Sequence, residues 1–311
     1  INPEGSFETW LKKQLNIFPH QSPWLLARSF WQPGGSENLV SLMMWLSNQE
    51  NESQDFQSPA ELPVAPSRIR WIWNGSIHDS LKPAMFDSDT LIILDSHRGD
   101  RLNDRMLTDA LCKGFASKEL QCLVALSYWG KPAADAVRQL TPFKSKIAGL
   151  VFLQDFVVGG GEAREQATNH FVSLNVPVLK AIKSYDRTQQ ERLLSVDGIA
   201  PEKIYYQVAM PELQGASQPL VIASKGTLQF HDATGLEYTD LDHDVTAIQM
   251  MSERLFGWVQ LQKKSNQDKK VAIVYYNHPP GRHNIGADNL DVPASLWQIL
   301  NGLKQKGYNT G

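Results

Sequence analysis

Residues 121–153, QCLVALSYWGKPAADAVRQLTPFKSKIAGLVFL, contain the pattern that decides the fold. Gln121–Ser127 and Ile147–Leu153 are short apolar runs, which are typical of buried strands. Residues 132–140 lie between them and have the amphipathic spacing of a helix. A strand, a helix and a second strand in this order predict a βαβ unit, in which the two strands run parallel.

The same alternation continues on both sides of this unit. Further strand candidates are Arg68–Trp73, Thr90–Asp95 and Val176–Ile182, and further helix candidates cover 102–115 and 162–174. This rhythm predicts an α/β fold with a mostly parallel, doubly wound sheet of the Rossmann or flavodoxin type. A short helix near 188–195 then precedes a small additional β region made of Ile204–Ala209, Leu220–Ala223 and Thr227–Phe230.

The rest of the chain divides into helical and polar segments. Residues 1–50 form a helical segment, in which one helix face carries Leu39, Leu42, Met43 and Leu46, and 51–66 form a polar, proline-containing linker. The α/β domain covers 67–235. A long helix follows within 236–266, capped by Asp242 or Asp244, with four side chains directed inward, namely Val245, Ile248, Leu255 and Val259.

Residues 267–311 are expected to begin a further α/β domain. Val271–Tyr276 has the composition of a buried strand. Asp291, Pro293 and Gly307 are placed to cap, begin and end a helix. The intervening loop, Asn277–Leu290, is long and follows the carboxyl end of a strand, where open α/β sheets bind their ligands. We therefore expect this loop to belong to a binding site.

Composition excludes some classes of function. The 311 residues carry a net charge of -3, which argues against a nucleic-acid-binding surface. No apolar run is long enough to span a bilayer. Cys112 and Cys122 lack the spacing of zinc or redox motifs, and we expect buried, reduced thiols. The chain begins at Ile1 and ends at Gly311 directly after a helix, so we expect a fragment of a longer protein.

Six segments carry short motifs in a consistent order from about residue 27 to residue 308. ARSFWQPGGSENL ends in GG-x-x-N-L, GIAPEKIYYQVAMPELQG contains Q-V-A-x-P-E-L-x-G, and the last segment contains P-P-x-x-x-N-I-G followed by LDVPASL. Together they resemble the CobN/magnesium chelatase family, the large subunits of ATP-dependent tetrapyrrole metal chelatases. The segments are Ala27–Leu39, Gly75–Phe86, Ile92–Asp100, Phe156–Lys180, Gly198–Ile222 and Lys269–Tyr308.

This resemblance implies an amino-terminal part of a cobaltochelatase-type ligase that binds a tetrapyrrole and inserts a divalent metal. The LDVPASL wording favours cobalt over magnesium. ATP is expected to be used by separate AAA+ partner subunits, and this fragment alone is expected to be inactive. Three positions depart from the family pattern: Asp79 replaces a proline, Asp95 an arginine and His278 an aromatic residue.

The loop Asn277–Leu290 supplies most of the candidate site residues. His278 and His283 are candidate metal ligands, because neutral imidazole suits first-row ions. Arg282 is a candidate partner for a carboxylate of the macrocycle, and His283, Asn284 and Gly286 complete the ligand-binding set from this loop. The alternative is a structural turn shaped by prolines and glycines, with solvated histidines.

Other candidate residues follow other predicted strands. His97 and His78 are candidate ligand-binding residues, or else loop-packing side chains. Glu212 is the candidate general base, because metal insertion removes two pyrrole protons, or else a turn residue. Gly159–Gly161 matches neither dinucleotide nor P-loop spacing, and we interpret it as a helix start with close backbone packing.

Two alternative functions stay open. One is a relative that removes iron from haem during haem uptake, and the other is a non-catalytic α/β binding module. We expect a cytoplasmic protein, or a periplasmic one where a secretory signal precedes this segment.

Overall fold

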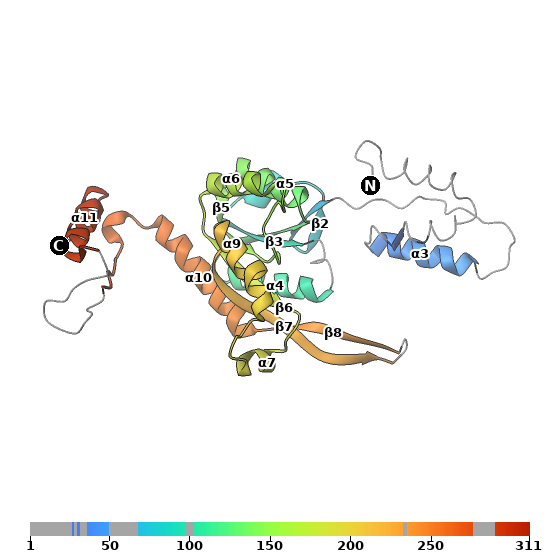
Figure 1. The fold of residues 1–311 in the computed structure, drawn as a ribbon. Helices are drawn as coiled ribbons and strands as arrows, with labels where there is room; N and C mark the ends of the chain where they lie inside the picture. The colour runs from blue at the N-terminus through green and yellow to red at the C-terminus, as the bar shows by residue number, and fades with distance from the viewer. Residues whose placement is uncertain are drawn as a thin grey trace. The chain divides into compact units, whose positions relative to one another are not determined.

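The computed structural model describes residues 27, 30–31, 36–49, 68–96, 102–232, 235–275 and 290–311. It divides into two units, residues 1–68 and 69–311 (Figure 1). In the first unit the helix α3, Ser36–Gln49, buries Leu42 and Trp45 against Phe30. Leu39, Met43 and Leu46 are exposed. The face predicted for this helix is therefore wrong except at Leu42.

The second unit is built around one eight-stranded sheet. Its strand order is β2-β1-β4-β3-β5-β6-β7-β8, in which β4, β3, β5, β6 and β7 are parallel neighbours. The strands are β1 (Ile69–Trp73), β2 (Ser76–His78), β3 (Thr90–Ser96), β4 (Gln121–Ser127), β5 (Ile147–Phe152), β6 (Val178–Ser184), β7 (Ser217–His231) and β8 (Leu236–His243).

The five parallel strands follow the order 2-1-3-4-5 when they are numbered along the chain, which is the flavodoxin-like doubly wound order. The predicted fold class is confirmed. In this order the chain reverses direction across the sheet between β3 and β5, and ligands of such folds bind outside the carboxyl ends of the strands at that point.

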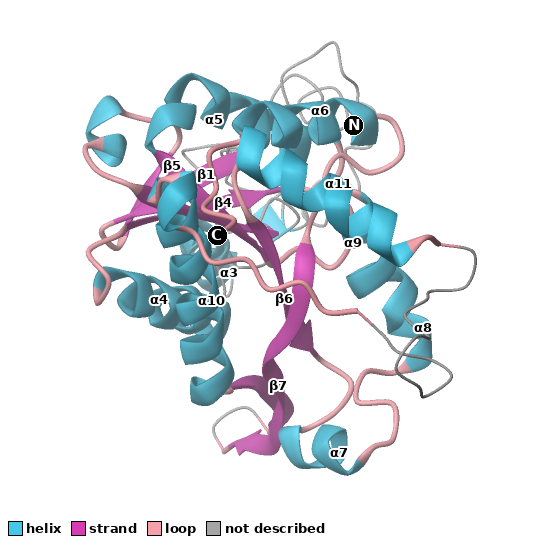
Figure 2. Ribbon diagram, turned by 90° about the vertical axis from the view of Figure 1, so that its left-hand side faces the viewer, coloured by secondary structure: helices cyan, strands magenta, loops and turns pink. Residues whose placement is uncertain are grey.

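Helices cover both faces of the sheet (Figure 2). One face packs against α5 (Lys131–Leu140) and α6 (Arg164–Leu174), and the other against α4 (Leu102–Ala116) and α10 (Val245–Lys263). Successive side chains of a strand point to opposite faces. Thus Ile92 and Leu94 of β3 join the core cluster under α5 and α6, whereas Leu91 and Ile93 join the cluster under α4 and α10.

The capping predictions for the last two long helices are confirmed. Asp244 caps α10 by accepting a hydrogen bond from the backbone N–H of Ala247 at 2.9 Å. Asp291 caps α11, Val292–Gln305, in the same way. Three of the four predicted inward residues of α10 are buried, but Val245 is exposed. Within the described residues, none of the helices has the length and apolar character needed to cross a bilayer.

The predicted small β region is wrong. Ile204–Ala209 is helical, because Pro201 begins a continuous helical segment: α8 (Pro201–Ile204), a π-helical turn (Tyr205–Ala209) and α9 (Met210–Leu213). Leu220–Ala223 and Thr227–Phe230 are parts of the single strand β7, which belongs to the main sheet. A short helix, α7 (Gln189–Leu194), precedes this region as expected.

The predicted strand Val271–Tyr276 is also not formed over its described residues, 271–275. No strand in the described part of the chain pairs with them, and Val271 and Val274 are exposed. An apolar run with β-forming residues needs a neighbouring strand before it joins a sheet. The loop that follows lies outside the described residues up to Asn289, so the expectation that it faces the sheet edge stays a prediction.

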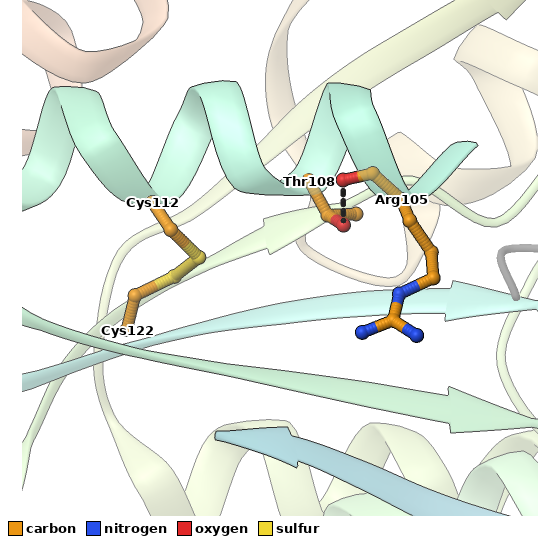
Figure 3. Close-up of a disulfide and its surroundings, with 4 residues drawn as sticks. All are labelled: Arg105, Thr108, Cys112 and Cys122. Atoms are coloured by element: carbon orange, nitrogen blue, oxygen red, sulfur yellow. Dashed lines mark hydrogen bonds between the residues drawn. A yellow bond between two sulfur atoms is a disulfide. The ribbon is translucent and has the colours of Figure 1, made fainter. Parts of the chain in front are cut away.

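Cys112 and Cys122 form a disulfide, so the expectation of reduced thiols is wrong (Figure 3). Cys112 lies on α4 and Cys122 on β4, and packing of this helix against the sheet brings their Cα atoms to 5.4 Å. That separation is usual for disulfides. The spacing of the two cysteines in the sequence carries no sign of it, because the bond joins two different elements across a turn.

Candidate functional site

The carboxyl ends of the parallel strands carry buried polar side chains. Asp95 is near the end of β3, Ser127 ends β4, Gln154 follows β5, and Lys183 is near the end of β6. All four are buried. Burying polar groups costs free energy unless they are hydrogen-bonded, and their position at the switch point of the sheet marks this edge as the candidate site.

A charged cluster of Asp95, Asp104 and Lys183 lies at the centre of this edge. The Lys183 ammonium donates to both carboxylate oxygens of Asp95, at 2.9 and 3.0 Å, and to Oδ1 of Asp104 at 2.8 Å. These contacts use all three N–H donors of the lysine. The side chains of Lys183 and Asp95 are 2% and 1% exposed. The charged cluster therefore joins β3, β6 and α4 through charge-assisted bonds shielded from water.

Burial and charge act in opposite directions on these groups. Burial disfavours the Lys183 ammonium, but the negative charges of Asp95 and Asp104 outweigh it and hold the pKa of Lys183 above its usual range. Burial raises the pKa of Asp95, and the neighbouring Lys183 opposes that rise. Because every N–H of Lys183 has an anionic acceptor, the ion pair is the form expected at neutral pH.

A second lysine, Lys180, lies on the opposite face of β6. Its ammonium donates to the backbone carbonyl of Gln154 at 2.6 Å and lies 4.9 Å from the ring centre of Phe152. Burial lowers the pKa of Lys180 to about 7, while the charge of Asp155 opposes the shift. This amine therefore titrates near neutral pH.

Gln154 links the strand ends and leaves one acceptor open. Its Nε2 donates to Ser127 Oγ at 3.0 Å and to the backbone carbonyl of Asp95 at 3.3 Å. Its Oε1 is buried and has no hydrogen-bond partner among the described residues. Such an atom is usually satisfied by water or by a ligand.

Exposed aromatic side chains surround the same edge. We call Trp129, Phe156, Tyr185, Tyr205 and Tyr206 the aromatic ledge. Trp129 follows β4, Phe156 follows β5, Tyr185 follows β6, and the other two lie on the π-helical turn. The rings of Phe156 and Tyr206 are 5.4 Å apart and those of Tyr205 and Tyr206 are 5.0 Å apart, both edge to face.

The π-helical turn is attached to the charged cluster by Gln207. Its Nε2 donates to Asp155 at 3.2 Å and, more weakly, to the backbone carbonyl of Lys183 at 3.5 Å. The Tyr185 hydroxyl donates to Asp104 at 3.4 Å, and burial raises the pKa of Tyr185 to about 12. π-helical turns are frequent at functional sites, and here the turn carries two rings of the aromatic ledge.

The structure describes two of the residues predicted for the site. His78 ends the edge strand β2, where its ring lies 6.1 Å from that of Trp73 and its buried Nε2 lacks a partner among the described residues. It is part of a strand rather than of a loop after one, and it makes no contact with the charged cluster. The other predicted residues, His97, His278, Arg282, His283, Asn284 and Gly286, lie outside the described residues.

Glu212 is exposed on α9, at the end of the helical segment that carries the π-helical turn. Two residues further on, Gln214 accepts a hydrogen bond from the backbone N–H of Val158 at 2.8 Å and donates to its carbonyl at 2.9 Å. These bonds attach the end of α9 to the loop after β5. Glu212 is therefore near that loop but outside the charged cluster.

Gly159 and Gly160 have the close backbone packing that the sequence suggested. Both have positive φ, at 90° and 60°. A Cβ on Gly159 would lie 2.4 Å from the carbonyl oxygen of Ala163, and one on Gly160 would lie 2.9 Å from the ring of Trp129. The loop after β5 therefore packs directly against Trp129.

Sequence reasoning missed Lys180, Lys183 and Asp104. The signal was present in β6, VLKAIKS, because lysine is rarely buried in a strand unless it is paired. The described residues contain no group of His, Cys, Asp and Glu side chains arranged to hold a metal ion. In the charged cluster, the lysine ammonium lies between the two carboxylates.

Comparison with known proteins places the chain in a family. Residues 28–311 match the family model CobN/Magnesium Chelatase. The magnesium-chelatase large chain of Chlorobaculum parvum, known by the letter H, is 32% identical over 93% of this chain and 23% of its own length. The aerobic cobaltochelatase subunit CobN of Pseudomonas aeruginosa is 33% identical over 43% of this chain and 11% of its own.

A solved structure shows the same fold. The catalytic subunit of cobaltochelatase from Mycobacterium tuberculosis superposes with a TM-score of 0.65 at 19% identity, over 93% of this chain and 23% of that one. The chain thus spans about a quarter or less of the length of these relatives. With the family model matching almost the whole sequence, the chain belongs to the CobN/magnesium chelatase family.

Proposed function

We propose that this chain is part of the tetrapyrrole-binding large subunit of an ATP-dependent metal chelatase, which inserts a divalent metal, cobalt by preference, into a corrin- or porphyrin-type ring. The observation that carries the proposal is the family match over residues 28–311. The metal and the macrocycle are substrates. ATP is hydrolysed by AAA+ partner subunits, and these 311 residues alone do not catalyse insertion.

Metal insertion exchanges two pyrrole protons for one divalent cation. A carboxylate close to the macrocycle accepts such protons as a general base. We assign this role to Glu212, which is exposed on α9. The loop residues Arg282, Asn284 and Gly286 and the histidines His78 and His97 serve macrocycle binding, while His278 and His283 hold the incoming metal.

The charged cluster supplies rigidity to this site. Lys183 connects β3, β6 and α4 at the edge where the strand-end loops begin. Binding groups held by packed and hydrogen-bonded neighbours lose less conformational freedom when a ligand binds. The loops after β4, β5 and β6 are thus supported by a fixed base.

The role of Glu212 is tested with the complete subunit and its AAA+ partners. Glu212→Gln is expected to lower the rate of metal insertion at least about tenfold while the dissociation constant for the macrocycle stays unchanged. Glu202→Gln, an exposed glutamate on α8, is the matched control. Equal rates for both variants would exclude Glu212 as the base. Absence of binding to cobalt-free corrinoid, protoporphyrin and haem alike would exclude the tetrapyrrole-binding role and favour a non-catalytic module.

The disulfide favours a second candidate, removal of iron from haem in an oxidising compartment. Cys112–Cys122 is the observation behind it, because structural disulfides persist mainly outside the reducing cytosol. In this reaction two protons replace the iron in the ring. With the complete subunit under anaerobic conditions and reduced haem, iron-free porphyrin accumulates without AAA+ partners if this candidate is right. If the iron stays in the ring under these conditions, while metal is inserted with ATP and the partners, it is wrong.

A further inference from the structure

We propose that the aromatic ledge is the surface on which one face of the flat macrocycle rests. This inference deepens the proposed function and rests on it, because it names the part of the described fold that contacts the tetrapyrrole. The ligand is a conjugated, largely apolar ring system, and the contact is ring against ring.

The first argument is exposure. Trp129, Tyr185, Tyr205 and Tyr206 are 62%, 48%, 54% and 51% exposed. Single exposed apolar residues are ordinary on a protein surface, but a group of large aromatic side chains around one sheet edge indicates a binding surface. Their elements meet at the carboxyl ends of β4, β5 and β6, beside the switch point where ligands of this fold class bind.

The second argument is that the ledge is built before a ligand arrives. Trp129 lies against Gly160, at a position where a Cβ would meet the indole ring. Tyr206 lies edge to face against Phe156, and the next residue, Gln207, donates to Asp155. Phe156 and Gly160 belong to the same loop after β5, so this loop supports both the indole and the tyrosine ring. Rings held in this way bind a flat ligand with a smaller loss of conformational entropy.

The third argument is chemical. Aromatic faces and edges attract one another in offset and edge-to-face arrangements at centroid separations of about 4.5–7 Å, and the pairs within the ledge already adopt such separations. Nearby polar groups, the Asp155 carboxylate and the Tyr185 hydroxyl, are engaged with Gln207 and Asp104. The ledge therefore offers stacking area rather than free hydrogen-bond donors, which suits the face of a macrocycle.

The test is a titration of the 311-residue chain with free-base protoporphyrin, followed by its visible absorption band. Two variants remove rings and keep apolar bulk: Trp129→Leu, and the double variant Tyr205→Leu with Tyr206→Leu. Each is expected to raise the dissociation constant about tenfold, as expected for loss of ring stacking and its buried area. Tyr238→Leu on β8, an exposed tyrosine outside the ledge, is the control and should bind like the unchanged chain.

The outcomes separate the ledge from the proposed function. If the unchanged chain binds and the ledge variants bind equally well, the ledge is not the contact surface, and the proposed function stands. If the unchanged chain binds no macrocycle, both the ledge and the tetrapyrrole-binding role of this chain fail. If the ledge variants lose stability in urea instead of affinity, another part of the protein covers the ledge, and the inference is overturned.

Discussion

At the scale of single residues, Lys183 determines whether the edge of the sheet is stable. Lys183→Met leaves Asp95 and Asp104 buried without a counter-charge, and we expect a loss of about 3–5 kcal/mol in the free energy of unfolding. Urea denaturation measures it. Lys146→Met, at an exposed lysine, is the control. Adding Asp95→Asn to Lys183→Met should recover part of the loss, since it removes one unpaired charge. A loss as small as that of the control would contradict the buried ion pair.

Lys180 predicts a pH dependence with a definite sign. Its pKa is lowered from 10.5 to about 7 in the folded chain. Between these values the unfolded chain binds the proton and the folded chain does not, so the free energy of unfolding rises with pH. The rise attributable to Lys180 is about 1.4 kcal/mol per pH unit within this window. Urea denaturation at several pH values between about 7 and 9 measures it.

The variant Lys180→Met isolates this contribution. Its free energy of unfolding should be lower overall, because the carbonyl of Gln154 loses a donor, but its slope with pH should be smaller than that of the unchanged chain. Identical slopes in the two proteins would mean that Lys180 does not lose its proton on folding near neutral pH.

At the scale of elements, the disulfide fixes α4 to β4. The bond closes a short loop between residues ten positions apart, and replacing both cysteines by alanine is expected to cost about 2–3 kcal/mol of stability. Thermal unfolding with and without reductant provides the measurement. Reductant should lower the melting temperature of the unchanged chain and leave that of the double variant unaltered. Alkylation of both cysteines in unfolded, unreduced protein would show that the bond is absent.

The same scale shows how much the sequence can predict. The four strands β3 to β6 and the helices between them have boundaries within two residues of prediction, because each carries its own period and its own breakers. Ile204–Ala209 differs, since IYYQVA has strand composition but follows a helix that Pro201 begins. Val271–Val274 has strand composition too, but a strand exists only where a neighbour pairs with it.

At the scale of the whole molecule, the candidate site was beyond the reach of local patterns. Lys183 contacts Asp95 across 88 residues of sequence and Asp104 across 79. Such contacts depend on the strand order, which alternating strands and helices do not specify. Once the order is known, the switch point between β3 and β5 follows, and the polar ends of the strands gather there.

The position of the core predicts that a shorter chain folds. Both sheet-covering core clusters lie between Trp71 and Val259. We therefore expect residues 69–264 to unfold cooperatively in urea, with a free energy within about 1 kcal/mol of that of the 311-residue chain. Loss of cooperativity would show that the segments on either side contribute to this core.

This shorter chain also separates the two proposed contacts with the macrocycle. It retains the aromatic ledge and lacks the loop Asn277–Leu290. If the ledge supplies most of the stacking area, residues 69–264 should bind free-base protoporphyrin with a dissociation constant within about tenfold of that of the whole chain, because a lost loop removes only its own contacts. If the loop is the main binding element, binding should disappear although the shorter chain is folded. Titrations of both chains under the same conditions decide between a macrocycle held by the sheet edge and one held by the loop, since folding is checked independently by urea denaturation.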